Sequence, residues 1–377
     1  MPNDAKNETR SIPISAARVQ LAGKSRGALS RLQGRFESAA REPFDDGWTR
    51  DDEAPAALET QVTEERATSI IQRNDSPDLP FELSINPYRG CEHGCVYCYA
   101  RPSHAYLELS PGLDFETRLF AKVNAVERLR EELARPSYVP KPISLGANTD
   151  CYQPIERRYR ITRGVIELLS ECVHPLTIVT KSALIERDLD LLGPMSRGNL
   201  AKVFVSLGTL DRALARRLEP RAASPQRRLD TIRALARAGV PVGVMLAPVV
   251  PALSDKSVEE SLEAAAAAGA SMAGYQMLRL PNELKAIFRE WLAAHYPLRA
   301  EHVMSVVQQL RGGRDNDPRF GTRMTGTGNY AELLAKRFEI ACRRLGLNGA
   351  ERGNAARREL DCSGFVRPSP GGQLRLF

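Results

Sequence analysis

Three cysteines stand close together in the chain, where Cys91, Cys95 and Cys98 form a C-x3-C-x2-C pattern. They come soon after an apolar run at residues 81–85, so we expect them in a loop at the carboxyl end of a strand. Gly90 and Gly94 free the backbone there to wrap around a bulky ligand. Because ordinary [4Fe–4S] sites use four cysteines, three thiolates suit a cubane cluster with one iron left open to a substrate or cofactor.

Zinc is the main alternative occupant of this motif. His93 would complete a Cys3His set, and structural zinc sites are four-coordinate. However, His93 is only two residues from Cys91 and from Cys95, whereas zinc sites usually pair ligands from two separated knuckles. Buried thiols or a disulfide are the third possibility. The spacing favours the cluster and leaves the other two open.

The composition narrows the classes of protein. The chain has 377 residues, 42% of them hydrophobic and 26% charged, with a formal net charge of +7. This length suggests two domains or one large α/β domain with additions. Seven cysteines are too few for a disulfide scaffold, so we expect reduced thiols and a cytoplasmic location. Residues 1–6 are polar, unlike a signal peptide, and prolines break the longest apolar stretch at residues 239–253, so no membrane segment is expected.

Short apolar runs alternate with amphipathic segments from about residue 80. Six such βα units predict a parallel sheet, and their continuous apolar character indicates that both faces of the sheet are buried. This pattern suits a partial barrel or an open doubly wound sheet equally well. Ser224-Pro225 is typical of a helix start, and Gly239 of a helix end. The expected strands are Phe81–Ile85, Pro142–Gly146, Leu176–Thr180, Val203–Leu207, Pro241–Ala247 and Ala273–Leu278, and the expected helices between them include Leu119–Leu133, Ile161–Cys172, Leu184–Leu192, Arg212–Leu218, Pro225–Ala238 and Ser257–Ala268.

The ends of the chain differ from its middle in composition and in hydrophobic pattern. Residues 1–60 change from basic to acidic and lack apolar periodicity, so a disordered or loosely docked extension is expected. The core of alternating strands and helices should span residues 61–280. Residues 281–347 are mostly helical in pattern, over Leu284–Tyr296, His302–Leu310 and Tyr330–Leu345. Residues 348–377 are rich in Gly and Arg and are predicted to form a flexible tail.

The cysteine motif, with Tyr97 before its last cysteine and Tyr99 after it, resembles the radical S-adenosylmethionine (SAM) superfamily signature. The wider pattern resembles one branch of that superfamily, the group related to spore photoproduct lyase and labelled DNA repair photolyase-like. This wider resemblance covers residues from about 80 to 345. It rests on four segments: Asn148-Thr149-Asp150-Cys151-Tyr152-Gln153-Pro154-Ile155-Glu156, Val179-Thr180-Lys181-Ser182, Leu218-Glu219-Pro220-Arg221 and Val244-Met245-Leu246-Ala247-Pro248.

The resemblance implies an α/β fold, namely a partial (β/α)6 TIM-type barrel with the cluster at its carboxyl-terminal mouth. It also implies that SAM binds the open iron and that one electron from the reduced [4Fe–4S] cluster cleaves it. The products are methionine and a 5′-deoxyadenosyl radical, which abstracts hydrogen from a substrate. An electron donor such as flavodoxin or ferredoxin is then required.

The resemblance also assigns roles to single residues. Cys91, Cys95 and Cys98 would ligate the cluster, and Tyr97 would lie near the adenine. Lys181 would pair with the SAM carboxylate, or else be a solvated lysine at a strand end. The remaining candidates are Ser206 for the ribose or carboxylate of SAM, Asn148, Thr149 and Asp150 near its amino group, and Arg279 for substrate or SAM; a backbone-bonded serine and an exposed ion pair are the alternatives for Ser206 and Arg279.

Cys151 lies in the region where spore photoproduct lyase uses a cysteine to return a hydrogen atom to the product radical. We therefore interpret it as a candidate hydrogen-atom donor, although small buried cysteines without a role are common. The other cysteines, Cys172, Cys342 and Cys362, fall in helical or tail segments and are interpreted as structural.

The substrate is the least determined part of the prediction. The family resemblance and the mild basic excess favour DNA or RNA, while a peptide, a protein or a small metabolite is the alternative. A non-catalytic, zinc-stabilised nucleic-acid-binding module is a third hypothesis. A dense arginine run from Arg212 to Arg237 is either a solvated face or a stripe that contacts phosphates.

Overall fold

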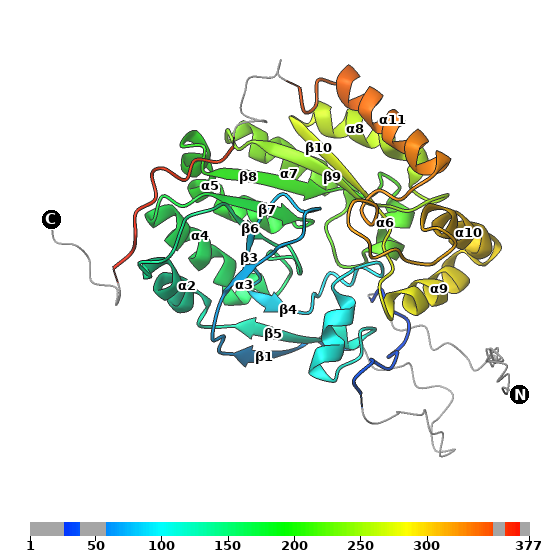
Figure 1. Cartoon of the computed structure of the whole chain (residues 1–377), viewed down its shortest axis with the longest axis horizontal. Coiled ribbons are helices and arrows are strands. Elements are labelled where there is room, and N and C mark those ends of the chain that lie inside the picture. The colour runs from blue at the N-terminus through cyan, green and yellow to red at the C-terminus, as the bar shows by residue number, and fades with distance from the viewer. Residues whose placement is uncertain (1–25, 38–57, 350–358, 370–377) are drawn as a thin grey trace, which may run out of the picture.

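A computed structural model describes residues 26–37, 58–349 and 359–369 of the chain. Its centre is a seven-stranded sheet with the order β10-β9-β8-β7-β6-β3-β2 (Figure 1). Every neighbouring pair is parallel except β2 with β3, which is antiparallel and forms one edge. The strands are β2 (Ile71–Arg73), β3 (Leu83–Ile85), β6 (Ile143–Leu145), β7 (Leu176–Thr180), β8 (Ala201–Ser206), β9 (Val242–Val249) and β10 (Met272–Met277).

The six parallel strands coincide with the six predicted apolar runs, which confirms those strand predictions. The sheet is curled rather than flat, because alternate side chains of successive strands line one shared cavity. Thr177 of β7, Phe204 of β8 and Met245 of β9 are among them. Of the two architectures left open by the sequence, the structure therefore has the partial barrel.

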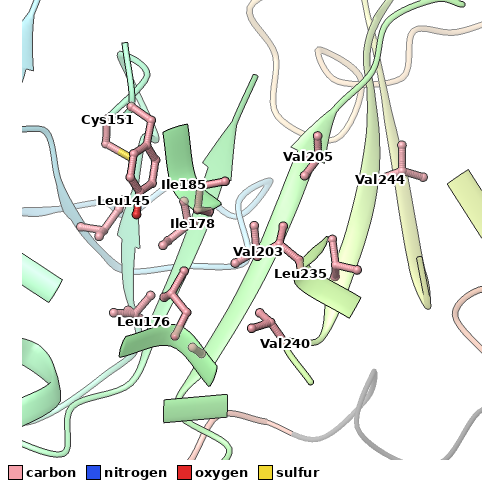
Figure 2. Packing of buried hydrophobic residues seen from close by; sticks show 14 of the residues in the cluster. Leu145, Cys151, Leu176, Ile178, Ile185, Val203, Val205, Leu235, Val240 and Val244 are labelled. Atoms are coloured by element: carbon pink, nitrogen blue, oxygen red, sulfur yellow. The ribbon is translucent and has the colours of Figure 1, made fainter. Parts of the chain in front are cut away.

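Helices cover the outer face of the curled sheet and bury it. The strands present fully buried aliphatic side chains such as Ile178, Val203 and Val244, which pack around Leu235 from the helix that follows β8 (Figure 2). The helix starts as predicted, because the Ser224 hydroxyl accepts a hydrogen bond from the Arg227 amide at 3.3 Å. The covering helices are α2 (Ala125–Ala134), α4 (Ile161–Glu171), α5 (Leu189–Arg197), α7 (Pro225–Arg237) and α8 (Val258–Ala267).

A second, three-stranded sheet was not predicted. Its order is β1-β5-β4, with β1 (Gln61–Glu65) parallel to β5 (Arg118–Lys122) and β4 (Tyr88–Arg89) antiparallel to it. The predicted helix over Leu119–Leu133 is therefore wrong in its first turn, since β5 occupies that part and α2 begins only at Ala125. The strand conformation of β5 depends on partners that lie far away in the chain, which helical periodicity cannot reveal.

The carboxyl-terminal region is helical, as predicted for residues 281–347. It contains α9 (Leu284–His295), α10 (Ala300–Leu310) and α11 (Asn329–Arg344). In α9, Phe288 and Trp291 are fully buried and pack with Ala28 and Val96 in a second core cluster. Short helices complete the described part of the chain: η1 (Arg101–Leu107), α1 (Asp114–Thr117), α3 (Glu156–Tyr159), η2 (Ala183–Asp188), α6 (Arg212–Leu218), η3 (Asp255–Ser257) and η4 (Pro297–Arg299).

Two described parts of the predicted extensions are packed rather than loose. Residues 26–37, which we call the strap, run beside α9 and η1 (Figure 1), and Ala28 is 1% exposed. At the other end, the Val366 amide donates to the Cys172 carbonyl at 2.8 Å, and Phe365 packs on the His174 ring. The expectation of a loosely docked extension and a flexible tail is corrected for these residues. Residues 1–25, 38–57, 350–358 and 370–377 lie outside the described residues.

His174 should make stability depend on pH. Burial lowers the pKa of its imidazole to about 4, and the neutral ring accepts a hydrogen bond from the Tyr138 hydroxyl at 2.7 Å. The unfolded chain takes up the proton near pH 6.5, so protonation favours unfolding as the pH falls from about 6.5 to about 4. We expect the free energy of unfolding to lose up to about 3 kcal/mol in this window through His174 alone.

Urea unfolding at several pH values checks this expectation. A His174→Gln variant should show a shallower decline between pH 6.5 and pH 4 than the wild type. The exposed His302 on α10 offers a matched control, and His302→Gln should keep the wild-type slope. Equal slopes for His174→Gln and the wild type would contradict the prediction.

None of the helices in the described part of the chain has the length and apolar character that a membrane span requires.

Candidate active site

One cavity of about 470 Å³ lies inside the curled sheet and extends to the carboxyl ends of its strands. Its volume falls in the range of about 300–1,000 Å³ that is usual for small-molecule and cofactor sites. Nearly every site residue predicted from the sequence lines it. They are Cys91, Cys95, Tyr97, Cys98, Asn148, Thr149, Asp150, Lys181, Ser206 and Arg279. The carboxyl ends of parallel strands meet at one edge, which brings together residues from distant parts of the chain.

The three cysteines belong to a loop that follows β4 and is fixed by its backbone. The Cys91 amide donates to the Phe115 carbonyl at 2.9 Å, and the Val96 amide donates to the Leu218 carbonyl at 3.0 Å. Gly94 has a φ of +67°, a conformation that favours glycine. All three thiols are free of disulfides, and burial raises the pKa of Cys91 and raises that of Cys95 to about 12.

The donor set fits an iron–sulfur cluster better than a single zinc ion. Among the described residues, no group of three or more His, Cys, Asp or Glu side chains is placed to hold one metal ion. The His93 Nδ1 atom lies 3.3 Å from Asp150 Oδ2, so the ring is turned toward a carboxylate. Three thiols that face a shared cavity without converging on one point suit a ligand wider than one ion.

Arg101 holds the backbone of the cysteine loop in place. Its guanidinium is fully buried and donates to the Cys95 carbonyl at 2.8 Å and to the Gly94 carbonyl at 3.1 Å. It also forms an ion pair with the fully buried Glu116. Buried charges of this kind are stable only when paired and hydrogen-bonded, so this pair fixes the backbone of the loop.

The strap completes the surroundings of Glu116. The amides of Gly27 and Ala28 donate to the two oxygens of its carboxylate at 2.9 and 2.8 Å. Gly27 also approaches the loop so closely that a Cβ atom on it would stand 1.8 Å from the Gly94 carbonyl oxygen. The strap, Glu116, Arg101 and the cysteine loop therefore form one hydrogen-bonded unit.

Tyr97 is held by a buried acid. Its hydroxyl donates to Glu219, which also receives a hydrogen bond from Arg228. Although burial acts to raise the pKa of Glu219, the charges of Arg228 and Lys181 hold that pKa below its usual value. The Lys181 ammonium lies 5.9 Å from the centre of the Tyr97 ring. A positive charge and an aromatic ring that Glu219 holds thus stand side by side next to Cys95.

Asp150 is a buried carboxylate with a fixed orientation. It accepts hydrogen bonds from the Thr180 hydroxyl and the Lys181 amide, both at 2.7 Å, and from the Tyr152 amide at 2.9 Å. Burial acts to raise its pKa, but His93 and these hydrogen bonds hold the pKa below the usual range. Asp150 therefore presents a negative charge to the cavity.

The other polar candidates use part of their hydrogen-bonding capacity within the fold. The Thr149 hydroxyl donates to the Tyr88 carbonyl at 2.9 Å, and the Ser206 hydroxyl donates to the Ala247 carbonyl at 3.2 Å. The backbone amide of Asn148 donates to the Asn86 side-chain oxygen at 2.9 Å, so this contact does not involve the side chain of Asn148. Their positions on the cavity wall agree with the prediction, and their roles stay predictions.

Cys151 does not reach the cavity. It is fully buried in the main core cluster beside Leu145 (Figure 2) and is absent from the residues that line the cavity. Burial raises the pKa of its thiol. The prediction of a hydrogen-atom donor therefore lacks the access that it needs in this structure. The residue one position earlier in the chain, Asp150, takes the place on the cavity wall.

Arg279 stands at the mouth, after β10. Its guanidinium carbon lies 5.9 Å from the centre of the Tyr99 ring, and it forms no ion pair within the described residues. Its Nε atom is buried without a hydrogen-bond partner, and burial together with Arg323 lowers the pKa of the group. An arginine without a carboxylate partner is suited to an anion that enters the cavity.

Sequence reasoning missed several residues that hold the site together. Glu219 lies in a quoted motif, but nothing in the motif showed that it supports Tyr97. Arg228 belongs to the arginine run interpreted as a solvated face or a phosphate-contacting stripe, yet it is 2% exposed. Arg101 and Glu116 carry no local signal, because their partners lie elsewhere in the chain.

The fold and the site together define an α/β barrel protein with a cysteine-rich cofactor site at its mouth. Residues 85–265, just under half of the chain, match the family model described as the radical SAM superfamily. This match confirms the superfamily predicted from the cysteine motif. The superfamily implies a [4Fe–4S] cluster and SAM as cofactors.

Relatives and solved structures agree with this assignment. An uncharacterized protein of Mycobacterium tuberculosis is 42% identical over 221 residues, which are 58% of this chain and 65% of that protein. An uncharacterized protein of Methanocaldococcus jannaschii is 26% identical over 171 residues, or 45% of this chain and 61% of that protein. The chain thus spans somewhat less than two thirds of the length of these relatives.

Spore photoproduct lyase has a similar fold. One structure of a mutant of that enzyme gives a TM-score of 0.55 at 17% identity, covering 76% of this chain and 80% of that chain. Another, with AdoMet and the dinucleoside spore photoproduct bound, gives a TM-score of 0.54 at 18% identity with the same coverage. At these identities the likeness concerns the fold, and it agrees with the predicted partial TIM-type barrel.

Proposed function

We propose that the chain is a radical SAM enzyme that holds a [4Fe–4S] cluster through Cys91, Cys95 and Cys98 and binds SAM in the adjoining cavity. One observation carries this proposal: the three thiols line the same cavity as Tyr97, Asp150 and Lys181. An aromatic ring, a carboxylate and an ammonium beside the cluster ligands match an adenine, an amino group and a carboxylate respectively. When bound, the cluster and SAM supply a 5′-deoxyadenosyl radical that abstracts hydrogen from a substrate.

The residues of the chain perform the binding and positioning. Lys181 would pair with the SAM carboxylate, and Asp150, whose charge is fixed by three hydrogen bonds, would attract the SAM ammonium. Tyr97 is pinned by Glu219, so its ring is in place before the ligand arrives. A site preorganised in this way loses little entropy on binding.

The cavity is also suited to exclude water. Its wall includes Val179, Phe204, Met245, Met272 and Met277, which are apolar and give no hydrogen bond to a reacting group. Exclusion of water protects a reactive intermediate from side reactions. These residues lie on the inner faces of the strands, deeper in the barrel than the cysteines.

We further propose that the substrate is a nucleic acid. Arg279 at the mouth offers a charge suited to phosphate, and the half-exposed Tyr99 ring beside it offers a surface on which a base stacks. The solved structure of spore photoproduct lyase with a bound dinucleoside spore photoproduct also favours a nucleic-acid substrate. Salt-dependent binding of oligonucleotides tests this part, and a lack of affinity at low salt would remove its support.

Anaerobic reconstitution with iron and sulfide tests the proposed function. We expect about four irons and four sulfides per chain, because a cubane cluster contains that number of each. Reduction by dithionite in the presence of SAM should then release 5′-deoxyadenosine, measured by chromatography. A protein that binds one zinc, builds no cluster and leaves SAM intact would instead support the zinc-stabilised module.

A further inference from the structure

A second cavity, of about 420 Å³, lies on the outer side of the cysteine loop. Arg157 of α3, Arg221 and Arg227 line it, together with Ser182 and His93. His93 lines the cofactor cavity as well, so the two cavities adjoin at this residue. We call this feature the arginine pocket. It opens on the surface, whereas the cofactor cavity lies within the barrel.

The arginine pocket is joined directly to the loop that carries the cysteines. The Arg221 guanidinium pairs with Glu92 at 2.6 Å, and the Arg221 amide donates to the His93 carbonyl at 3.3 Å. Glu92 and His93 are two of the three residues between Cys91 and Cys95, and both contact Arg221 directly. A molecule bound at Arg221 would therefore be one residue away from the cluster ligands.

The surface around the pocket is basic. A smaller neighbouring cavity shares Ala222 and Ala223 with it and is lined by Arg212 and Arg216 of α6. Arg157, Arg212 and Arg216 are exposed, and the described residues give none of them a carboxylate partner. Arg212, Arg216 and Arg221 of the arginine run thus line these two cavities, and α6, which carries the first two, is labelled in Figure 1. Arg217 of the same run instead packs on the Tyr296 ring.

We propose that the arginine pocket and its surroundings are the docking surface for an acidic one-electron carrier protein of the flavodoxin or ferredoxin class. The inference rests on the proposed function, since a cluster must be reduced before SAM is cleaved. The carrier is oxidised by one electron and the cluster is reduced by one, and no atom is transferred. Opposite charges steer such partners together, and electron-transfer complexes are typically small and weak.

The position of the arginine pocket favours a carrier protein over a nucleic acid as its partner. A carrier protein needs only to come close to the cysteine loop. The arginine pocket reaches that loop at His93. A nucleic-acid substrate must instead place an atom inside the cofactor cavity, whose mouth is formed by other residues, Tyr99 and Arg279. Neither of these lines the arginine pocket. The two surfaces are therefore suited to act at the same time.

A double charge reversal, Arg157→Glu with Arg216→Glu, tests the surface in the reconstituted protein. We expect the dissociation constant for a fluorescently labelled flavodoxin, measured by anisotropy at low salt, to rise at least about tenfold. Release of 5′-deoxyadenosine should fall similarly when flavodoxin supplies the electron and stay unchanged with dithionite, which needs no docking surface. Arg237→Glu is the control for charge reversal, because Arg237 is exposed at the carboxyl end of α7, whereas the arginine pocket is lined by Arg227 at the amino end of that helix.

The outcomes separate the alternatives. Unchanged flavodoxin binding in the double variant would overturn the proposal. Lost oligonucleotide binding with intact flavodoxin binding would overturn it too and would assign the surface to nucleic acid. If the wild type releases no 5′-deoxyadenosine even with dithionite, the proposed function fails, whereas the binding comparison still decides whether the surface receives the carrier.

Discussion

A Cys95→Ala variant is expected to lose its iron almost completely and to release no detectable 5′-deoxyadenosine. Cys95 is 5% exposed and lines the cofactor cavity with Cys91 and Cys98, and a cubane cluster that already lacks a fourth protein ligand has none to spare. The two remaining thiols cannot hold three irons. Iron and sulfide analysis after reconstitution, followed by the dithionite assay with SAM, measures both effects.

Cys172 offers the matched control for this change. It is also a buried free thiol, at the end of α4, but it packs in the main core and lies outside the cavity. Cys172→Ala should therefore keep its iron and its activity, at a stability cost of about 1 kcal/mol for the removed buried group. Retention of a full cluster in Cys95→Ala would refute the assignment of the ligands. Loss in both variants would point to misfolding instead.

The cysteine loop could be predicted because its information is local. The spacing of Cys91, Cys95 and Cys98 favours a cluster site, and the apolar strands stand out because parallel strands are buried on both faces. The cavity-lining positions of Asp150 and Lys181 followed from the same logic. Lys181 directly follows β7 and Asp150 lies in the segment after β6, and the carboxyl ends of parallel strands converge.

The residues whose conformation or position was predicted wrongly, and those that were missed, depend on distant partners. Leu119 belongs to β5 because β1 and β4 pair with that strand, although the neighbours of Leu119 in the chain suit a helix. Cys151 and Asp150 are adjacent in the chain, but only the structure shows which of the two reaches the cavity. Both residues lie in the irregular segment after β6, where no strand alternation indicates which side chain faces the cavity.

Buried charge was the hardest feature to predict. Glu116 and Gly27 are 89 residues apart in the chain and meet beside the cysteine loop. A glutamate or an arginine is normally a surface residue, so its sequence context predicts exposure. The structure instead uses Arg101 and Glu116 as internal supports, and this use has a measurable consequence for cluster retention.

Gly27→Ala should loosen the cysteine loop without changing any residue of the cavity. The added methyl group would stand 1.8 Å from the Gly94 carbonyl oxygen, so the strap must move and its two hydrogen bonds to Glu116 must weaken. Hydrogen bonds to a charged group contribute about 1.5–3 kcal/mol each. We therefore expect a loss of about 3 kcal/mol in the free energy of unfolding, measured with urea on the cluster-free protein.

The same variant should release its iron to a chelator at least about ten times faster than the wild type, since a loop free to open exposes the cluster ligands. Gly198→Ala is the matched control, because a methyl group there meets nothing closer than 3.5 Å. An Arg101→Met variant removes the other side of the support and leaves Glu116 buried without its partner, which costs about 3–5 kcal/mol. If Gly27→Ala unfolds like Gly198→Ala and retains iron equally well, the strap plays no part in holding the loop. If Gly27→Ala is less stable but keeps its iron, the strap supports the fold while the cysteines alone retain the cluster.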